Sequence, residues 1–138
     1  MRPSIIAGLF VGLATGAWMF AEYALGFHDD PAGAGRWTGF LSLMFPVFGA
    51  YWTVVKSRLS NWIDPLREGL IFGSLGGLLG GAAIYFYFTV FNPGFTAGGP
   101  VVDAGTQAIT GFAGSLILGP ILIVIMYALI GRRSRNNG

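Results

Sequence analysis

Residues 69–91 read GLIFGSLGGLLGGAAIYFYFTVF, a stretch without a single charged side chain. A hydrocarbon core about 30 Å thick needs about 20 consecutive apolar residues of α-helix to cross it. The bilayer offers no hydrogen-bond partners to an open strand, so a span of this kind must be helical. Asp64 and Pro65 just before the stretch are typical of a helix start, with Asp64 as the N-cap. We therefore predict a transmembrane helix over 65–91.

Three further apolar runs of similar length flank this one, over 5–27, 38–55 and 107–130. Apart from Arg67 and Glu68 at the start of the third run, Glu22 is the only charged residue in the four runs. The sequence thus predicts an all-α membrane protein, a single domain over 1–138 with four transmembrane helices. The first run is too long for a typical signal peptide and is expected to be retained.

The composition supports this class and excludes several others. Of the 138 residues, 54% are hydrophobic and 10% are charged, whereas an average soluble domain is about 25% charged. The chain has no cysteine, which excludes disulfides, iron–sulfur centres and Cys-ligated zinc. Adjacent His28, Asp29 and Asp30 make a poor cation site because neighbouring residues rarely point at one ion. We expect no metal, no cofactor and no nucleic acid partner.

The cationic residues are distributed very unevenly between the two sides of the predicted membrane domain. All of the eight except Arg36 fall on one side, namely Arg2, Lys56, Arg58, Arg67, Arg132, Arg133 and Arg135. Lys and Arg are enriched in cytoplasmic segments of membrane proteins. These residues are therefore topology anchors, and both termini are expected in the cytoplasm.

Small residues recur at four-residue spacing along three of the four runs. Because lipid provides no hydrophobic drive between helices, small residues promote association by letting backbones approach closely. We expect the first and third runs to touch in their cytoplasmic halves and to separate in their outer halves, where bulky side chains lie. The predicted packing residues are Gly8, Gly12, Gly16, Gly69, Gly73, Gly77, Gly81, Gly111, Ser115 and Gly119.

The two halves of the chain resemble each other weakly. The first and third runs both open with Gly-Leu and continue with spaced glycines, while the second and fourth each contain a proline, Pro46 and Pro120. This pattern fits either a parallel two-helix repeat or coincidence in an apolar sequence. Each proline removes a backbone donor from its helix, so we predict a kink at both.

Glu22 is the candidate ion or proton site, because a carboxylate within a membrane span is by default a functional hypothesis. At 1.5 Å per residue it lies about 26 Å along a core of about 30 Å, near the outer boundary. There it can reach headgroups or water, or bond to a tyrosine or Arg36. Both an interfacial or structural role and a proton- or cation-handling role remain open.

Several short motifs resemble a family of four-span bacterial membrane proteins of unknown function, common in Bacteroidetes and relatives. They are the Gly8–Gly16 pattern, Lys56-Ser57-Arg58, Arg67-Glu68-Gly69-Leu70, Asn92-Pro93-Gly94-Phe95 and Gly131-Arg132-Arg133. The loop after Asn92-Pro93 is shorter here than is usual in that family. The resemblance implies a multi-pass protein of the bacterial inner membrane and supplies no activity.

No catalytic constellation is visible, because a single histidine cannot support a convincing Ser/His/Asp set. We expect a non-enzymatic protein whose partner is the lipid bilayer and whose role is association, as an accessory subunit beside another membrane protein or as a homo-oligomer. The alternative is a small ion- or proton-coupled transporter or channel that uses Glu22.

Overall fold

Long helices make up nearly all of the chain that the computed structural model describes, which is residues 1–27, 35–95 and 100–131. Two of the helices end in a π-helical turn, and no strand occurs within these ranges. In chain order the elements are α1 (Pro3–Ala24), α2 (Gly35–Leu41), α3 (Met44–Lys56), α4 (Ile63–Phe86) with η1 (Tyr87–Phe91), and α5 (Ala104–Met126) with η2 (Tyr127–Gly131).

Four segments are long and apolar enough to cross a membrane, Pro3–Ala24, Trp37–Lys56, Ile63–Phe91 and Ala104–Ile130. The predicted all-α fold with four spans is thereby confirmed, and the chain is a small multi-pass membrane protein. The bounds differ from the predicted ones by a few residues. The first helix ends before 27 because Gly26 takes a positive φ of 73°, which reverses the backbone at a helix C-terminus.

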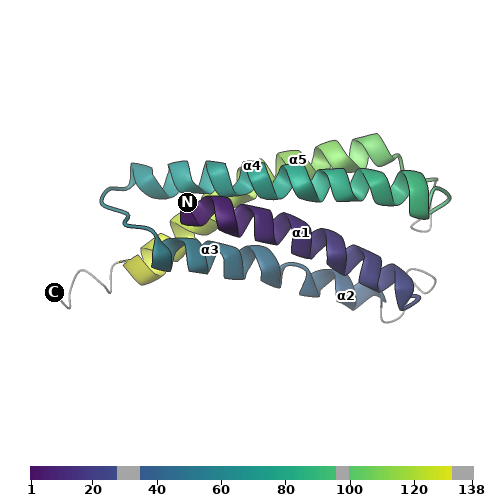
Figure 1. The fold of residues 1–138 in the computed structure, drawn as a ribbon, viewed down its shortest axis with the longest axis horizontal. Helices are drawn as coiled ribbons and strands as arrows, with labels where there is room; N and C mark the ends of the chain where they lie inside the picture. The colour runs from purple at the N-terminus through teal and green to yellow at the C-terminus, as the bar shows by residue number, and fades with distance from the viewer. Residues whose placement is uncertain (28–34, 96–99, 132–138) are drawn as a thin grey trace.

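Consecutive spans run in opposite directions, so the start of α1 and the end of η2 lie toward the same end of the bundle (Figure 1). This end also carries the α3–α4 loop. The cationic residues found here are Arg2 before α1, Lys56 at the end of α3, Arg58 in the loop and Arg67 near the start of α4. We call it the basic end, and the opposite one, with Ala24, Phe91 and Ala104, the distal end. Other predicted residues lie outside the described ranges, namely His28, Asp29, Asp30, Arg132, Arg133 and Arg135.

The glycine stripe of α4 packs directly on the backbone of α5. A methyl group on Gly69 or Gly73 would overlap Pro120 or the carbonyl of Ser115, and one on Gly77 would lie 2.8 Å from Ser115 Cβ. The Ser115 hydroxyl also donates a hydrogen bond of 2.9 Å to the Gly73 carbonyl. Backbone contact of this kind is available only where side chains are absent, so α4 and α5 form one tightly joined pair.

A different face of α4 receives α1. A methyl group on Gly8 would lie 2.8 Å from the Phe72 carbonyl, one on Gly12 2.9 Å from the Gly76 carbonyl, and one on Gly16 2.8 Å from Ala83 Cβ. The first and third spans therefore touch, as expected. The predicted stripe of Gly69, Gly73, Gly77 and Gly81 nevertheless faces α5 and not α1, since α4 is contacted on two sides.

The hydrophobic core lies in the half of the bundle nearer the basic end, where α1, α3, α4 and α5 meet. Its buried members are Ala7, Val11, Ala50, Val54, Phe72 and Ile123. Toward the distal end α1 and α4 diverge (Figure 1), and aromatic rings fill the space between them. Tyr87 is 1% exposed, and the Phe20 ring lies 5.6 Å from that of Tyr87 and 5.0 Å from that of Phe91.

The start of α4 differs from the prediction. The helix begins at Ile63, and the Asn61 side chain accepts hydrogen bonds from the amides of Ile63 and Asp64. The expectation that Asp64 is the N-cap is therefore wrong, because its carboxylate turns back to Ser60 and Asn61. At the start of α5, Asp103 does cap the helix, and hydrogen bonds from the Thr106 side chain and the Thr106 amide hold its carboxyl pKa below the usual value.

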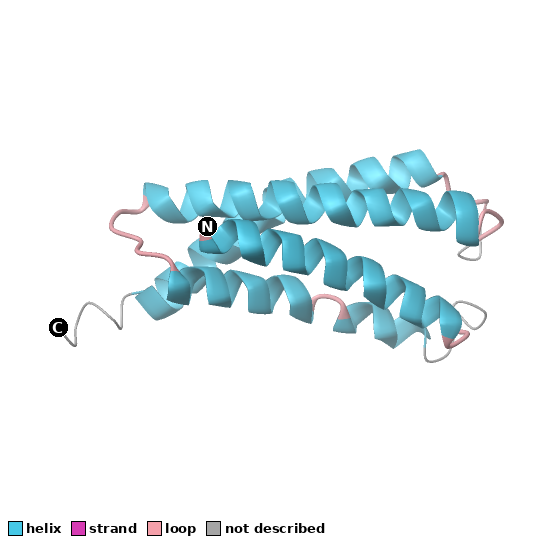
Figure 2. Cartoon of the chain, in the orientation of Figure 1, coloured by secondary structure: helices cyan, strands magenta, loops and turns pink. Residues whose placement is uncertain are grey.

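The second span is interrupted between α2 and α3, at Ser42 and Leu43 (Figure 2). Pro46 follows in the first turn of α3 and has no amide to offer the Ser42 carbonyl, which accepts from Phe45 instead, at 3.2 Å. Pro120 lies within α5, which stays helical through Met126. The two halves are both helical hairpins, but they differ at their prolines, so a repeat and a coincidence both stay open as explanations of the pattern.

We predict that Gly73→Ala destabilises the protein and that Gly80→Ala does not. The new methyl group at Gly73 would meet the Ser115 backbone, which cannot rotate away, and overpacking of this kind typically costs about 1–3 kcal/mol. A methyl group at Gly80 meets nothing within 4 Å and gains up to about 1 kcal/mol of helix propensity. Thermal unfolding of both variants in the same detergent tests this, and equal effects would contradict the α4–α5 interface described above.

Candidate functional site

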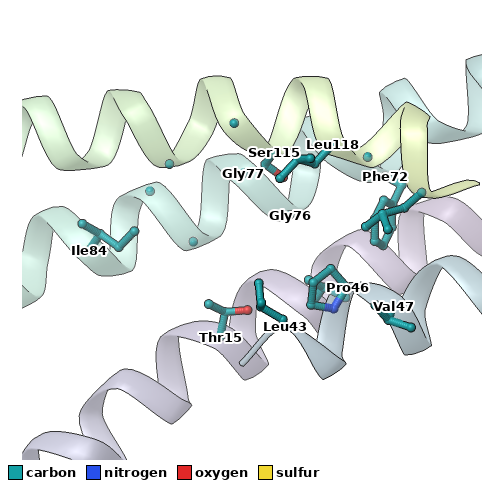
Figure 3. Close-up of a pocket in the computed structure, with 17 residues that line it drawn as sticks. Thr15, Leu43, Pro46, Val47, Phe72, Gly76, Gly77, Ile84, Ser115 and Leu118 are labelled. Carbon is teal, nitrogen blue, oxygen red and sulfur yellow. The ribbon is translucent and has the colours of Figure 1, made fainter. Parts of the chain in front are cut away.

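A cleft of about 550 Å³ lies between the second span and the α4–α5 pair, and Val11 and Thr15 of α1 also line it. Its volume is in the range of small-molecule and cofactor sites. Figure 3 shows the two walls, with Thr15, Leu43, Pro46 and Val47 on one side and Gly76, Gly77, Ser115 and Leu118 on the other. The remaining lining residues are Val11, Phe72, Gly80, Gly81, Ile84, Gly111, Gly114, Gly119 and Leu122.

The cleft exists because the four helices are joined in two different ways. Near the basic end α3 reaches α5 through the core residues Ala50, Val54 and Ile123. Farther along, the glycine contacts keep α5 on α4, while the second span stays with α1. The indole N–H of Trp18 donates to the Thr38 carbonyl at 3.2 Å, and the Trp18 ring stands edge-on to Phe45. The second span thus meets α5 at the core and stays with α1 farther along, and the cleft lies between it and the α4–α5 pair.

The interruption of the second span borders this cleft, since Leu43 and Pro46 both line it. Within a membrane, irregular backbone is tolerated where it is buried in protein or lines a cavity. Membrane transporters often form their binding sites at interrupted helices. The position of the break therefore marks the cleft as the candidate functional site.

Two glycines in the cleft wall have no neighbour that requires a glycine. A methyl group on Gly80 of α4 or on Gly114 of α5 would meet nothing within 4 Å, although both residues line the cleft. A glycine within a helix costs about 1 kcal/mol relative to alanine. At Gly73 and Gly77 close contact with α5 accounts for that cost, but within the described structure nothing accounts for it at Gly80 and Gly114.

The lining offers apolar contact and little else. The hydroxyl groups of Thr15 and Ser115 are its only side-chain polar groups, and that of Ser115 is bonded to Gly73. None of the lining residues is charged. Within the described ranges, no group of three or more His, Asp or Glu side chains is placed to hold a metal ion. This chemistry suits an apolar occupant.

Glu22 lies on the same side of α1 as the cleft, in a row with Val11, Thr15 and Trp18 at spacings of four, three and four residues. The residue is 8% exposed. The expectation that its carboxylate reaches headgroups or water is therefore wrong, because the residue is buried. The Arg36 side chain lies outside the described residues, so the suggested pairing with Glu22 stays a prediction.

A polar contact at the basic end was missed by the sequence analysis. The fully buried Ser4 hydroxyl donates a hydrogen bond to the Glu68 carboxylate, and the Arg2 guanidinium lies 3.9 Å from the same carboxylate. This contact ties the start of α1 to α4. The sequence carried a usable signal for this contact, because the predicted topology places Ser4 and Glu68 on the same side of the membrane.

Comparison with known proteins adds no relative. No protein-family model matches the chain, and neither a curated protein nor a solved structure is significantly similar to it. The resemblance to short four-span bacterial membrane proteins therefore stays a prediction.

We predict that Trp18→Phe loosens α2 from α1. The change removes the N–H that satisfies the Thr38 carbonyl, and a lost hydrogen bond of this kind costs about 0.5–1.5 kcal/mol. Hydrogen exchange in detergent should become faster at the amides of α2 and the following turn. The matched control is Trp37→Phe in the same span, where the indole is 69% exposed. Equal acceleration in both variants would refute the anchoring role of Trp18.

Proposed function

We propose that the protein is an accessory subunit of a membrane complex and that its cleft receives a transmembrane helix of a partner protein. The observation that carries this proposal is the pair Gly80 and Gly114, two helical glycines that line the cleft and at which an added methyl group would meet nothing within 4 Å. Residues of this kind are explained when another backbone comes close to them in the assembled complex.

Membrane physics favours a helix over lipid as the occupant. Association of helices in the bilayer depends on van der Waals packing, and small residues let two backbones approach closely. A flexible acyl chain adapts to a wall of alanine as well as to one of glycine, whereas a second helix is kept away by each added Cβ. The glycines of α4 and α5 thus form a surface suited to close contact with the backbone of another helix.

We further infer that the protein lies in a bacterial inner membrane with both termini in the cytoplasm. The support is the gathering of Arg2, Lys56, Arg58 and Arg67 at one end of the bundle, together with the preference of Lys and Arg for the cytoplasmic side.

We predict that Gly80→Leu and Gly114→Leu abolish capture of the partner and leave the fold intact. Each new side chain would occupy the cleft, where nothing stands within 4 Å of the first added carbon. The measurement is co-purification of the tagged protein from its native membranes in mild detergent, followed by mass analysis of the complex. We expect a foreign membrane protein in fixed stoichiometry with the unchanged chain and its loss in both variants.

The matched controls are Ala82→Leu and Ala113→Leu, at exposed positions two residues from Gly80 and next to Gly114. They add similar apolar bulk to the same helices outside the cleft lining and should retain the partner. Loss in all four variants would show a general packing defect. A chain that purifies alone, or only as a homodimer, would refute an accessory subunit.

A second candidate function is ion- or proton-coupled transport, favoured by one observation, the burial of Glu22 in a membrane span. Purified protein in liposomes, with an internal pH-sensitive dye and an imposed potential, separates the two functions. As an accessory subunit the protein should pass no protons or cations. A flux that stops in Glu22→Gln and partly returns in Glu22→Asp would favour transport and overturn our first proposal.

A further inference from the structure

The loop between α3 and α4 has a single, well-defined shape because its polar groups bond to each other. The Asp64 carboxylate accepts hydrogen bonds from the Ser60 amide at 2.8 Å, the Ser60 hydroxyl at 2.9 Å and the Asn61 amide at 3.2 Å. The Asn61 side chain in turn accepts from the first amides of α4. The Asp64 charge is thus directed into its own loop.

Glu68, the other carboxylate at the basic end, is engaged as well. It accepts the hydrogen bond from the buried Ser4 hydroxyl, and it forms the one ion pair within the described part of the chain, with Arg2. Its side chain is 14% exposed. Glu68 is therefore engaged elsewhere, whereas Asp64 still interacts electrostatically with Arg67.

Three cations remain at this end, Lys56 at the end of α3, Arg58 in the loop and Arg67 in the first turns of α4. All three are exposed. The same loop and helix start carry exposed apolar side chains, since Trp62 is 74%, Ile63 54% and Leu66 42% exposed. Tryptophan is enriched at the level of the lipid headgroups, where its ring meets both apolar and polar surroundings. The loop thus combines excess positive charge with apolar groups placed to enter the membrane interface.

We propose that Lys56, Arg58 and Arg67, together with Trp62, form a binding site for the phosphate headgroup of an anionic phospholipid. Cations next to a membrane surface attract anionic lipids, each contributing a similar increment. The hydrogen bonds of Asn61 and Asp64 hold the loop in place before the lipid arrives, so little ordering entropy is lost on binding.

A lipid fits this site better than a free phosphate. A free anion would gain from the three cations alone, while Trp62, Ile63 and Leu66 would gain nothing from it. The acyl chains of a phospholipid whose headgroup sits among these cations lie next to those apolar side chains. The cations and the apolar side chains therefore both contribute to binding only when the anion is the headgroup of a lipid.

The test uses the full chain in detergent micelles, where membrane orientation plays no part. Native mass spectrometry during titration with phosphatidylglycerol or phosphatidylcholine measures the affinity for each lipid. We expect tighter binding of phosphatidylglycerol, weakened by added salt and about fivefold by each of Lys56→Gln, Arg58→Gln and Arg67→Gln. Lys56→Arg and Arg58→Lys keep the charge and should keep the binding.

Arg2→Gln serves as the control for charge outside the site, because this cation is engaged with Glu68, and it should change the affinity much less. Equal affinity for the two lipids, or unchanged binding in the triple Gln variant, would overturn the proposal. Displacement of phosphatidylglycerol by inorganic phosphate, with Trp62→Ala binding as the wild type does, would show a site for free anions instead. Circular dichroism of each variant identifies any loss of fold.

Discussion

Direct contact between the backbones of α4 and its neighbours is the constraint on which the rest of the structure depends. Lipid tails are as apolar as leucine side chains, so burial of apolar surface does not hold membrane helices together. Here α4 meets α5 through Gly69, Gly73 and Gly77, and it meets α1 through Gly8 and Gly12. The hydrogen bond from Ser115 to the Gly73 carbonyl fixes the register of the closer pair. One helix thus organises the bundle from two sides.

This arrangement leaves the second span as the least constrained element. It has no comparable backbone contact with α4 or α5, and it is held by Trp18 at one end and by the core residues Ala50 and Val54 at the other. Between these two attachments the helix breaks at Ser42 and Leu43, and the cleft opens on the same side. The break and the cleft therefore have a common origin in the missing close contact.

The sequence predicted the four spans because a long uncharged run admits only one structure in a bilayer. It also identified the small residues, but spacing along one helix does not tell which neighbour a face meets. Gly77, which contacts α5, and Gly80, where an added methyl group would meet nothing within 4 Å, differ only in where a neighbouring helix runs. The start of α4 was mispredicted for a similar reason, since Asn61 and Asp64 are both good capping residues and the loop geometry decides between them.

The outcome for Glu22 shows what a depth estimate leaves out. Counting residues along α1 gave a position near the membrane boundary. Such a count estimates the depth of a residue in the bilayer and does not tell whether other parts of the protein bury it. At the same height the distal end carries bulky rings, such as those of Phe20, Tyr87 and Phe91, because α1 and α4 diverge there and large side chains are needed to fill the gap. A carboxylate facing into the bundle at that level is covered by protein. Divergence of α1 and α4 thus gives the aromatic cluster, whereas the cleft has a separate origin in the missing contact between the second span and the α4–α5 pair.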